Sequence, residues 1–82
     1  MEITFVEVRK ILHEQFSFHY DQIQPETKFE LELGTDSREM LELINVFESQ
    51  FEIEIDFDDI IDIVTVQDAV NYIKNKKESE TN

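Results

Sequence analysis

Residues 33–41 read LGTDSREML, and this stretch predicts the start of a central helix. Asp36 is placed to cap that helix, and Glu39, three residues later, completes the capping-box pattern with Asp in place of Ser or Thr. The apolar residues at helical spacing that would form its buried stripe are Met40, Leu43, Ile44, Phe47 and Phe51. The stretch therefore indicates a helix with a defined first turn and with Ser37 at its exposed N-terminal end.

Two further helices are predicted, one on each side of this one. Residues 3–16 place their apolar side chains on one stripe of a helix, and so do the residues from Thr65, a good N-cap, to about Lys74. The first stripe consists of Phe5, Val8, Ile11, Leu12 and Phe16, and the last of Val66, Ala69, Val70 and Ile73. Together with the central helix, these patterns predict three main helices.

The segments between these helices lack a continuous helical pattern. Residues 17–35 contain the only proline and the only glycine, and we expect a long loop held by buried apolar side chains. Those side chains are Phe18, Ile23, Phe29, Leu31 and Leu33. The stretch FEIEIDF at 51–57 alternates as a strand does, but a single strand would lack a partner, so we expect an extended connection that buries Ile53 and Ile55. Residues 58–62, with Ile60 and Ile61, are expected to form one short helix.

The predicted fold class is all-α: a small four-helix bundle with three main helices, one short helix and a long first loop. The 82 residues suffice for one small domain, in which 40% hydrophobic residues, seven of them phenylalanine, would supply the core. We place this domain at residues 1–75. The polar residues 76–82 show no periodicity and are expected to form a disordered tail.

Composition restricts the compartment and the partners. The absence of cysteine excludes a disulfide framework, a thiolate zinc site and a cysteine nucleophile, and fits a cytoplasmic protein. A formal net charge of -13 disfavours binding to nucleic acid and anionic lipid, favours basic protein surfaces and argues for a monomer. No apolar run approaches the roughly 20 residues of a membrane span, so no membrane insertion is expected.

Catalytic and metal sites are not indicated by the sequence. His13 and His19 have no ligand spacing, and the acidic run at 56–62 lacks the glycine and glutamate positions of a calcium loop, so no metal is expected. No nucleophile-elbow, phosphate-loop or zinc-protease motif occurs. The chain is therefore predicted not to be an enzyme.

Ser37 has two interpretations. A serine at the start of a helix is most often there to hydrogen-bond the backbone. Asp36 already serves as a candidate cap, however, and the helix N-terminus favours a phosphate ester because its N–H groups and dipole are oriented toward it. The residues around Ser37 therefore admit a covalently attached phosphodiester.

Three ordered segments resemble the acyl carrier protein family: FELELGTDS at 29–37, EMLELINVFESQFEIEI at 39–55 and TVQDAVNYI at 65–73. The resemblance extends from about Val6 to Ile73. It implies a four-helix bundle whose Ser37, preceded by Asp36, receives 4'-phosphopantetheine from coenzyme A through a separate phosphopantetheinyl transferase. The thiol of that arm would hold acyl groups as thioesters and move them between enzymes of a fatty-acid, polyketide or related specialised pathway.

The resemblance also implies a docking surface on the central helix for synthases, ligases or acyltransferases with basic patches. The positions that match are Asp36, Glu39, Leu41, Glu42 and Glu48. Two positions where the family usually has apolar residues are occupied by Arg38, which could pair with Glu42, and by Asn45. These differences indicate a specialised rather than a housekeeping carrier.

Two other functions stay open at this point. An aminoacyl or peptidyl carrier, including the D-alanyl type, shares the fold and the serine, although such relatives tend to be less acidic along this helix. An acidic helical interaction module could have kept the fold without the prosthetic group.

Overall fold

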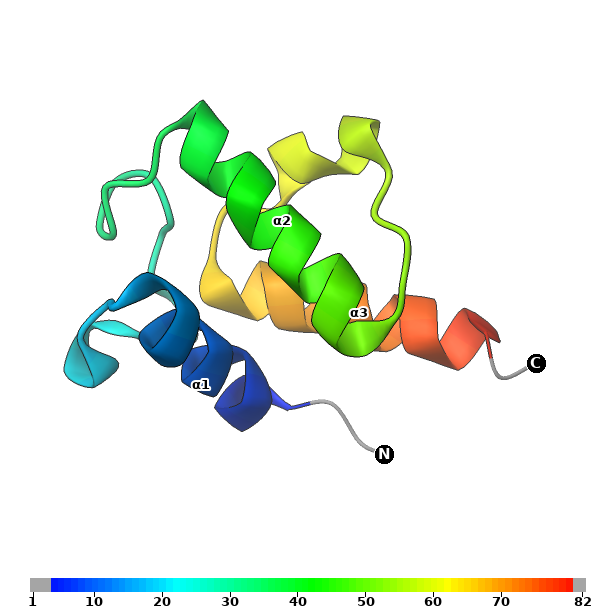
Figure 1. Cartoon of the computed structure of the whole chain (residues 1–82), viewed down its shortest axis with the longest axis horizontal. Coiled ribbons are helices and arrows are strands. Elements are labelled where there is room, and N and C mark those ends of the chain that lie inside the picture. The colour runs from blue at the N-terminus through cyan, green and yellow to red at the C-terminus, as the bar shows by residue number, and fades with distance from the viewer. Residues whose placement is uncertain (1–3, 81–82) are drawn as a thin grey trace.

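The computed structural model describes residues 4–80 and contains three α-helices and two short 3-10 helices in this range (Figure 1). Their bounds are α1 Phe5–Phe16, η1 Tyr20–Gln22, α2 Ser37–Phe51, η2 Phe57–Asp62 and α3 Val66–Glu80. The predicted all-α class, with three main helices and one short helix after the second, is confirmed. The single turn η1 lies within the long first loop.

The core is formed by the predicted apolar stripes of the three main helices. α1 packs against α3, and α2 crosses α3 in the view of Figure 1. The fully buried side chains with the largest volumes are Phe29, Phe47, Leu12, Ile23, Leu43, Ile73, Val8 and Val66. Two of these, Ile23 and Phe29, come from the first loop, so that loop belongs to the core.

Helix ends follow the local sequence. At the start of α1, the Thr4 N–H donates to Glu7 Oε2 at 3.0 Å. The helix was predicted to begin at Ile3, which lies outside the described residues, and α1 begins at Phe5. The residues after α1 and α2, Ser17 and Glu52, both adopt the left-handed conformation, with φ of 60° and 55°. Their N–H groups donate to carbonyls of the last turn, which closes both helices without glycine.

The first loop is joined to the start of α3 by backbone hydrogen bonds. The Phe29 N–H donates to the Val64 carbonyl at 3.0 Å, and the Val66 N–H donates to the Thr27 carbonyl at 2.9 Å. Buried Thr27 also donates its hydroxyl to the Gln22 carbonyl at 2.8 Å. The loop is therefore fixed at both its backbone and its side chains.

The connection after α2 is extended rather than a strand, as predicted. Ile53 and Ile55 are buried, and the Ile55 N–H donates to Glu48 Oε2 at 2.9 Å. The chain then forms η2, which contains no fully buried residue. This part of the molecule is held mainly by side chains of the neighbouring helices.

Two predictions about individual segments were wrong. Leu31 was expected to help hold the first loop, but its side chain is 80% exposed, because the turn at residues 29–33 directs it outward. The last helix was expected to end at about Lys74, but α3 continues to Glu80, so residues 76–80 of the expected disordered tail are helical. Lysine and glutamate are good helix formers, and they extend the helix beyond its apolar stripe. Residues 81–82 lie outside the described range, and the division into a domain and a tail stays a prediction.

Candidate functional site

Ser37 is the first residue of α2 and is exposed. Asp36 performs the capping: its Oδ1 accepts the Glu39 N–H at 2.8 Å, and Glu39 Oε1 accepts the Asp36 N–H at 3.4 Å. The predicted capping box is therefore confirmed. Because Asp36 caps the helix, the Ser37 hydroxyl is not required for that role and is available for chemistry.

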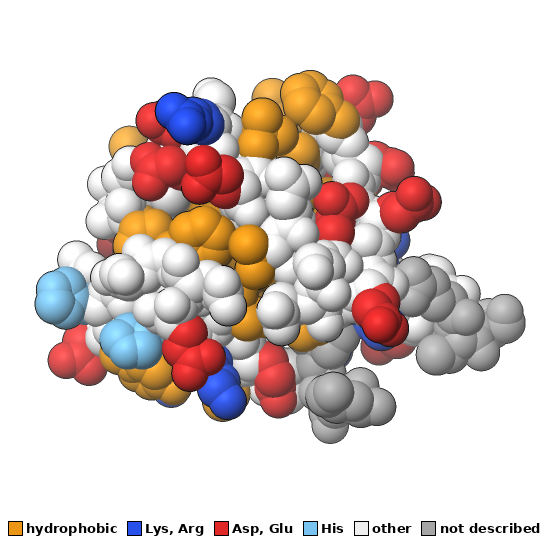
Figure 2. Space-filling model, viewed as in Figure 1, with side chains coloured by type: hydrophobic (Ala, Val, Ile, Leu, Met, Phe, Trp, Pro, Cys, Tyr) orange, Lys and Arg blue, Asp and Glu red, His pale blue; other side chains and the backbone are white. Residues whose placement is uncertain are grey.

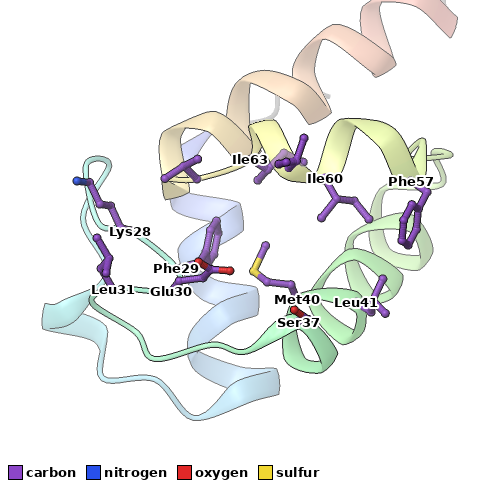
Figure 3. A pocket seen from close by; sticks show the side chains of 12 residues that line it. Lys28, Phe29, Glu30, Leu31, Ser37, Met40, Leu41, Phe57, Ile60 and Ile63 are labelled. Atoms are coloured by element: carbon purple, nitrogen blue, oxygen red, sulfur yellow. The ribbon is translucent and has the colours of Figure 1, made fainter.

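A cavity of about 430 Å³ opens beside Ser37 (Figure 3). Three segments form its walls: residues 28–31 of the first loop, the first turns of α2, and η2 with the residues that follow it. In Figure 3, Met40 points from α2 into the space between Phe29 and Ile60. Most of the lining side chains are apolar, so the cavity suits an apolar ligand more than a charged one.

Apolar side chains also gather on the surface around this cavity. Five large hydrophobic residues of its lining are exposed to solvent: Leu31, Leu41, Phe57, Ile61 and Val64. Figure 2 shows apolar side chains crowded at the upper edge of the molecule, over η2, with acidic side chains beside them. Such a grouping on a small protein is typical of a binding surface.

The remaining predicted docking residues lie along α2. Arg38 Nε and Glu42 Oε1 are 3.8 Å apart, so the expected ion pair is present, and both side chains are exposed. Leu41 is 42% exposed between them, and Asn45 is exposed. Glu48 is half-buried and accepts the Ile55 N–H, so its carboxylate also serves the connection after α2.

The apolar residues outside α2 that complete the site were not predicted from the sequence. Phe57, Ile60 and Ile63 line the cavity but stand in an acidic stretch whose helical pattern is short. The signal available in the sequence was the grouping of several large apolar residues within one acidic stretch, since a cluster of such residues on a surface marks a binding site.

Tyr72 of α3 joins this part of the structure to the main helices. Its hydroxyl donates to Asp59 Oδ2 at 2.6 Å and accepts the Asp56 N–H at 3.3 Å. Burial raises the pKa of the Tyr72 phenol above its usual value of 10.0, and the hydrogen bond to Asp59 acts in the same direction. The phenol therefore stays protonated and remains a donor at neutral pH.

Among residues 4–80, no group of three or more His, Cys, Asp or Glu side chains is arranged to hold a metal ion. None of the described helices combines the length and the apolar character that crossing a membrane requires.

Comparison with known proteins gives a consistent result. The family model described as the phosphopantetheine attachment site matches residues 6–73. An acyl carrier protein of Nitratidesulfovibrio vulgaris, strain Miyazaki F, is 44% identical over 70 residues, which cover 85% of this chain and 92% of that protein. An acyl carrier protein of Campylobacter jejuni, strain RM1221, is 40% identical over 74 residues, with 90% and 96% coverage.

This chain belongs to the acyl carrier protein family. The resemblance inferred from the three sequence segments is thereby confirmed, and phosphopantetheine is the prosthetic group of the family. Members of the acyl carrier protein family are carriers rather than catalysts, in agreement with the predicted role.

The Ser37 end of α2 fits this prosthetic group in three respects. The hydroxyl is exposed, Asp36 leaves it unused by the helix cap, and the N-terminus of a 15-residue helix favours a phosphodiester. The adjoining cavity offers apolar walls. The carboxylates of Asp36 and Glu39 would oppose the phosphate charge, and both are engaged in the capping box at the start of α2.

Proposed function

We propose that Ser37 carries 4'-phosphopantetheine and that this protein transports acyl groups between enzymes of a fatty-acid, polyketide or related specialised pathway. The observation that supports this proposal is the exposed Ser37 hydroxyl at the rim of an apolar cavity of about 430 Å³. The prosthetic group supplies a terminal thiol that holds acyl groups as thioesters. The cytoplasmic location and the monomeric state expected from the sequence stay predictions.

In this proposal, the residues of the chain itself have three roles. Asp36 and Glu39 define the first turn of α2 and so present Ser37 to a transferase. Met40, Phe29 and Ile60 provide apolar contacts in the cavity. Burial of each methylene of an apolar chain there would contribute about 0.8 kcal/mol, which is enough to hold a chain of several carbons away from water.

The docking surface that we propose on α2 combines an exposed apolar residue with acids. Leu41 stands between Glu39 and Glu42, and the net charge of -13 favours encounter with basic partner surfaces. The Arg38–Glu42 pair is exposed and is worth only about 0.2–0.5 kcal/mol, so a partner could replace it at little cost. Asp36, Asn45 and Glu48 complete this surface.

Arg38 and Asn45 support a specialised carrier, because both make the docking surface less apolar. We expect a generic fatty-acid ketosynthase to use the loaded protein poorly, with kcat/KM at least about tenfold higher for the Arg38→Leu/Asn45→Met double variant, a change of about 1.4 kcal/mol. Glu14→Gln, an exposed substitution on α1, is the control and should not change the rate. Efficient use of the unaltered protein by such an enzyme would contradict the specialised role.

Attachment is tested by intact-mass spectrometry after incubation with coenzyme A and a broad-specificity phosphopantetheinyl transferase. We expect one added phosphopantetheine in the unaltered protein and none in Ser37→Ala. Ser49→Ala is a matched control, because Ser49 is also exposed and lies on the same helix. No addition with several different transferases would instead favour an unmodified interaction module.

The cargo separates the acyl from the aminoacyl alternative. The named relatives are acyl carrier proteins, and the apolar lining of the cavity favours an alkyl chain over a charged amino acid. We expect a fatty acyl group on the modified protein to raise its melting temperature more than an alanyl group does. A larger rise with the alanyl group would favour the aminoacyl carrier.

A further inference from the structure

Tyr72 links α3 to the start of η2. Its hydroxyl donates to Asp59 in the first turn of η2 at 2.6 Å and accepts the N–H of Asp56, the residue before η2, at 3.3 Å. Lys76, one turn further along α3, pairs with Asp56 Oδ2 at 3.8 Å, and its ammonium lies 5.6 Å from the centre of the Tyr72 ring. A single phenol therefore bonds both the residue that precedes η2 and a residue within its first turn.

The position of η2 depends on few other contacts. Phe57 and Ile61 are 75% and 82% exposed, no residue of η2 is fully buried, and Ile60 packs against the core while only partly buried. In the described part of the chain, the backbone hydrogen bonds around η2 are local, from the Asp59 N–H to Asp56 and from the Ile63 N–H to Ile60. With little buried apolar area to hold η2, the bonds from Tyr72 become important for its placement.

η2 is also one wall of the cavity beside Ser37. Figure 3 shows Phe57 and Ile60 projecting from η2 toward the side of α2 that carries Met40 and Leu41. A displacement of η2 away from α2 would therefore enlarge the cavity. Firm attachment of η2 to α3 keeps the cavity at its present size.

We propose that Tyr72 is a positioning residue that fixes η2 against the helices and thereby sets the length of acyl chain that the cavity accommodates. This inference rests on the proposed carrier function for its cargo, but the attachment of η2 by Tyr72 is independent of Ser37 modification. Tyr72 does not contact the cavity and acts through Asp56 and Asp59. Its removal loosens one wall and leaves the lining residues unchanged.

The first test uses the unmodified protein and hydrogen–deuterium exchange of peptides that cover residues 56–62. Tyr72→Phe keeps the ring and removes only the hydroxyl, and exchange there should become about 2- to 12-fold faster, the effect of losing one hydrogen bond. Tyr20→Phe is the matched control, because Tyr20 lies in the first loop, where its ring packs against Arg9. Unchanged exchange in Tyr72→Phe would overturn the inference whether or not Ser37 is modified.

The second test uses protein loaded with a series of saturated acyl chains from 4 to about 16 carbons. The melting temperature should rise with chain length until the cavity is full and then stay constant, which defines a plateau. In Tyr72→Phe we expect this plateau to begin at a chain at least about two carbons longer. Asp59→Ala, which removes the other partner of the bond, should give the same shift, and the double variant should add nothing further. A merely structural role of Tyr72 would lower all melting temperatures equally and leave the plateau in place, which would overturn the inference.

The two proposals fail in distinguishable ways. If the unaltered protein cannot be loaded at Ser37, the carrier function is wrong, and the cavity-size role of Tyr72 falls with it even if exchange in η2 is faster. If loading succeeds and the plateau is the same in Tyr72→Phe and Tyr20→Phe, the carrier function stands and only the role of Tyr72 is wrong.

Discussion

The first loop and η2 form two walls of the same cavity, but the molecule holds them differently. The first loop buries Ile23 and Phe29 and shares backbone hydrogen bonds with the start of α3. η2 buries no residue fully and is held by the partly buried Ile60 and by hydrogen bonds from the side chain of Tyr72. The difference suggests that one wall is part of the core while the other can be adjusted by single side-chain contacts.

The contrast arises because the polar groups of the two segments have different surroundings. The first loop follows α1 and must span to α2, and its buried Thr27 hydroxyl is paired with two backbone partners. η2 lies at the surface, where water can satisfy its polar groups, so it needs fewer fixed partners. A carrier that accepts cargo of different sizes would benefit from having one fixed and one adjustable wall.

The largest expected effect comes from removing a core side chain of the first loop. Phe29→Ala should lower the free energy of unfolding by about 3–5 kcal/mol, because Phe29 is 1% exposed and its removal leaves a cavity. Phe57→Ala is the matched change in η2, and it should stay within about 0.5 kcal/mol, since Phe57 is 75% exposed. Chemical denaturation measures both. Similar losses in the two variants would remove the contrast between the walls.

A smaller effect is expected from two buried threonines of the first loop, Thr27 in its middle and Thr35 at its end. Thr27→Val should cost about 1–3 kcal/mol, because its hydroxyl donates to the Gln22 carbonyl and accepts the Gln24 N–H at 2.9 Å. Thr35 is buried to the same extent, but its hydroxyl has no hydrogen-bond partner within the described residues.

Thr35→Val should therefore be neutral or stabilising, by at most about 1 kcal/mol, since valine removes an unsatisfied hydroxyl at nearly constant volume. The same denaturation experiment compares the two threonines directly. An equal loss in both variants would mean that burial alone, and not hydrogen bonding, determines the stability of this loop.

The sequence predicted the parts of this structure that local signals encode. The capping residues Asp36 and Glu39 define the start of α2, and the alternation at 51–57 was assigned correctly because a strand would have lacked a partner. Ser37 could be identified as a candidate attachment site for the same reason: its relevant neighbours are adjacent in the chain. Leu31 could not be placed, because apolar character in a loop does not say which way a side chain points.

The cavity and Tyr72 could not be predicted from local patterns. The walls of the cavity come from three segments that meet only in the folded chain. Tyr72 contacts Asp59, which lies 13 residues earlier in the chain, and the chain changes direction between them. No helical or strand periodicity relates the two residues. The adjustable wall therefore became visible only in the structure.

The smallest expected effect concerns the pH dependence of the attachment of η2. Because the pKa of Tyr72 is raised above 10.0 in the folded protein, its contribution to stability is fully present below pH 10 and is lost as the pH rises through the folded value. The phenolate could no longer donate to Asp59, and only Lys76 would offset its charge near the two acids.

At neutral pH, Tyr72→Phe should be less stable than the unaltered protein by about 0.5–1.5 kcal/mol, the contribution of one hydrogen bond. That difference should stay constant below pH 10 and shrink as the pH rises above 10, when unfolding by denaturant is measured across this range. Tyr20→Phe is the control, because it shows how the loss of another tyrosine hydroxyl changes the free energy of unfolding over the same pH range. If the Tyr72→Phe difference follows the Tyr20→Phe difference at every pH, the phenol contributes no special bond, and η2 is held by its packing like the first loop.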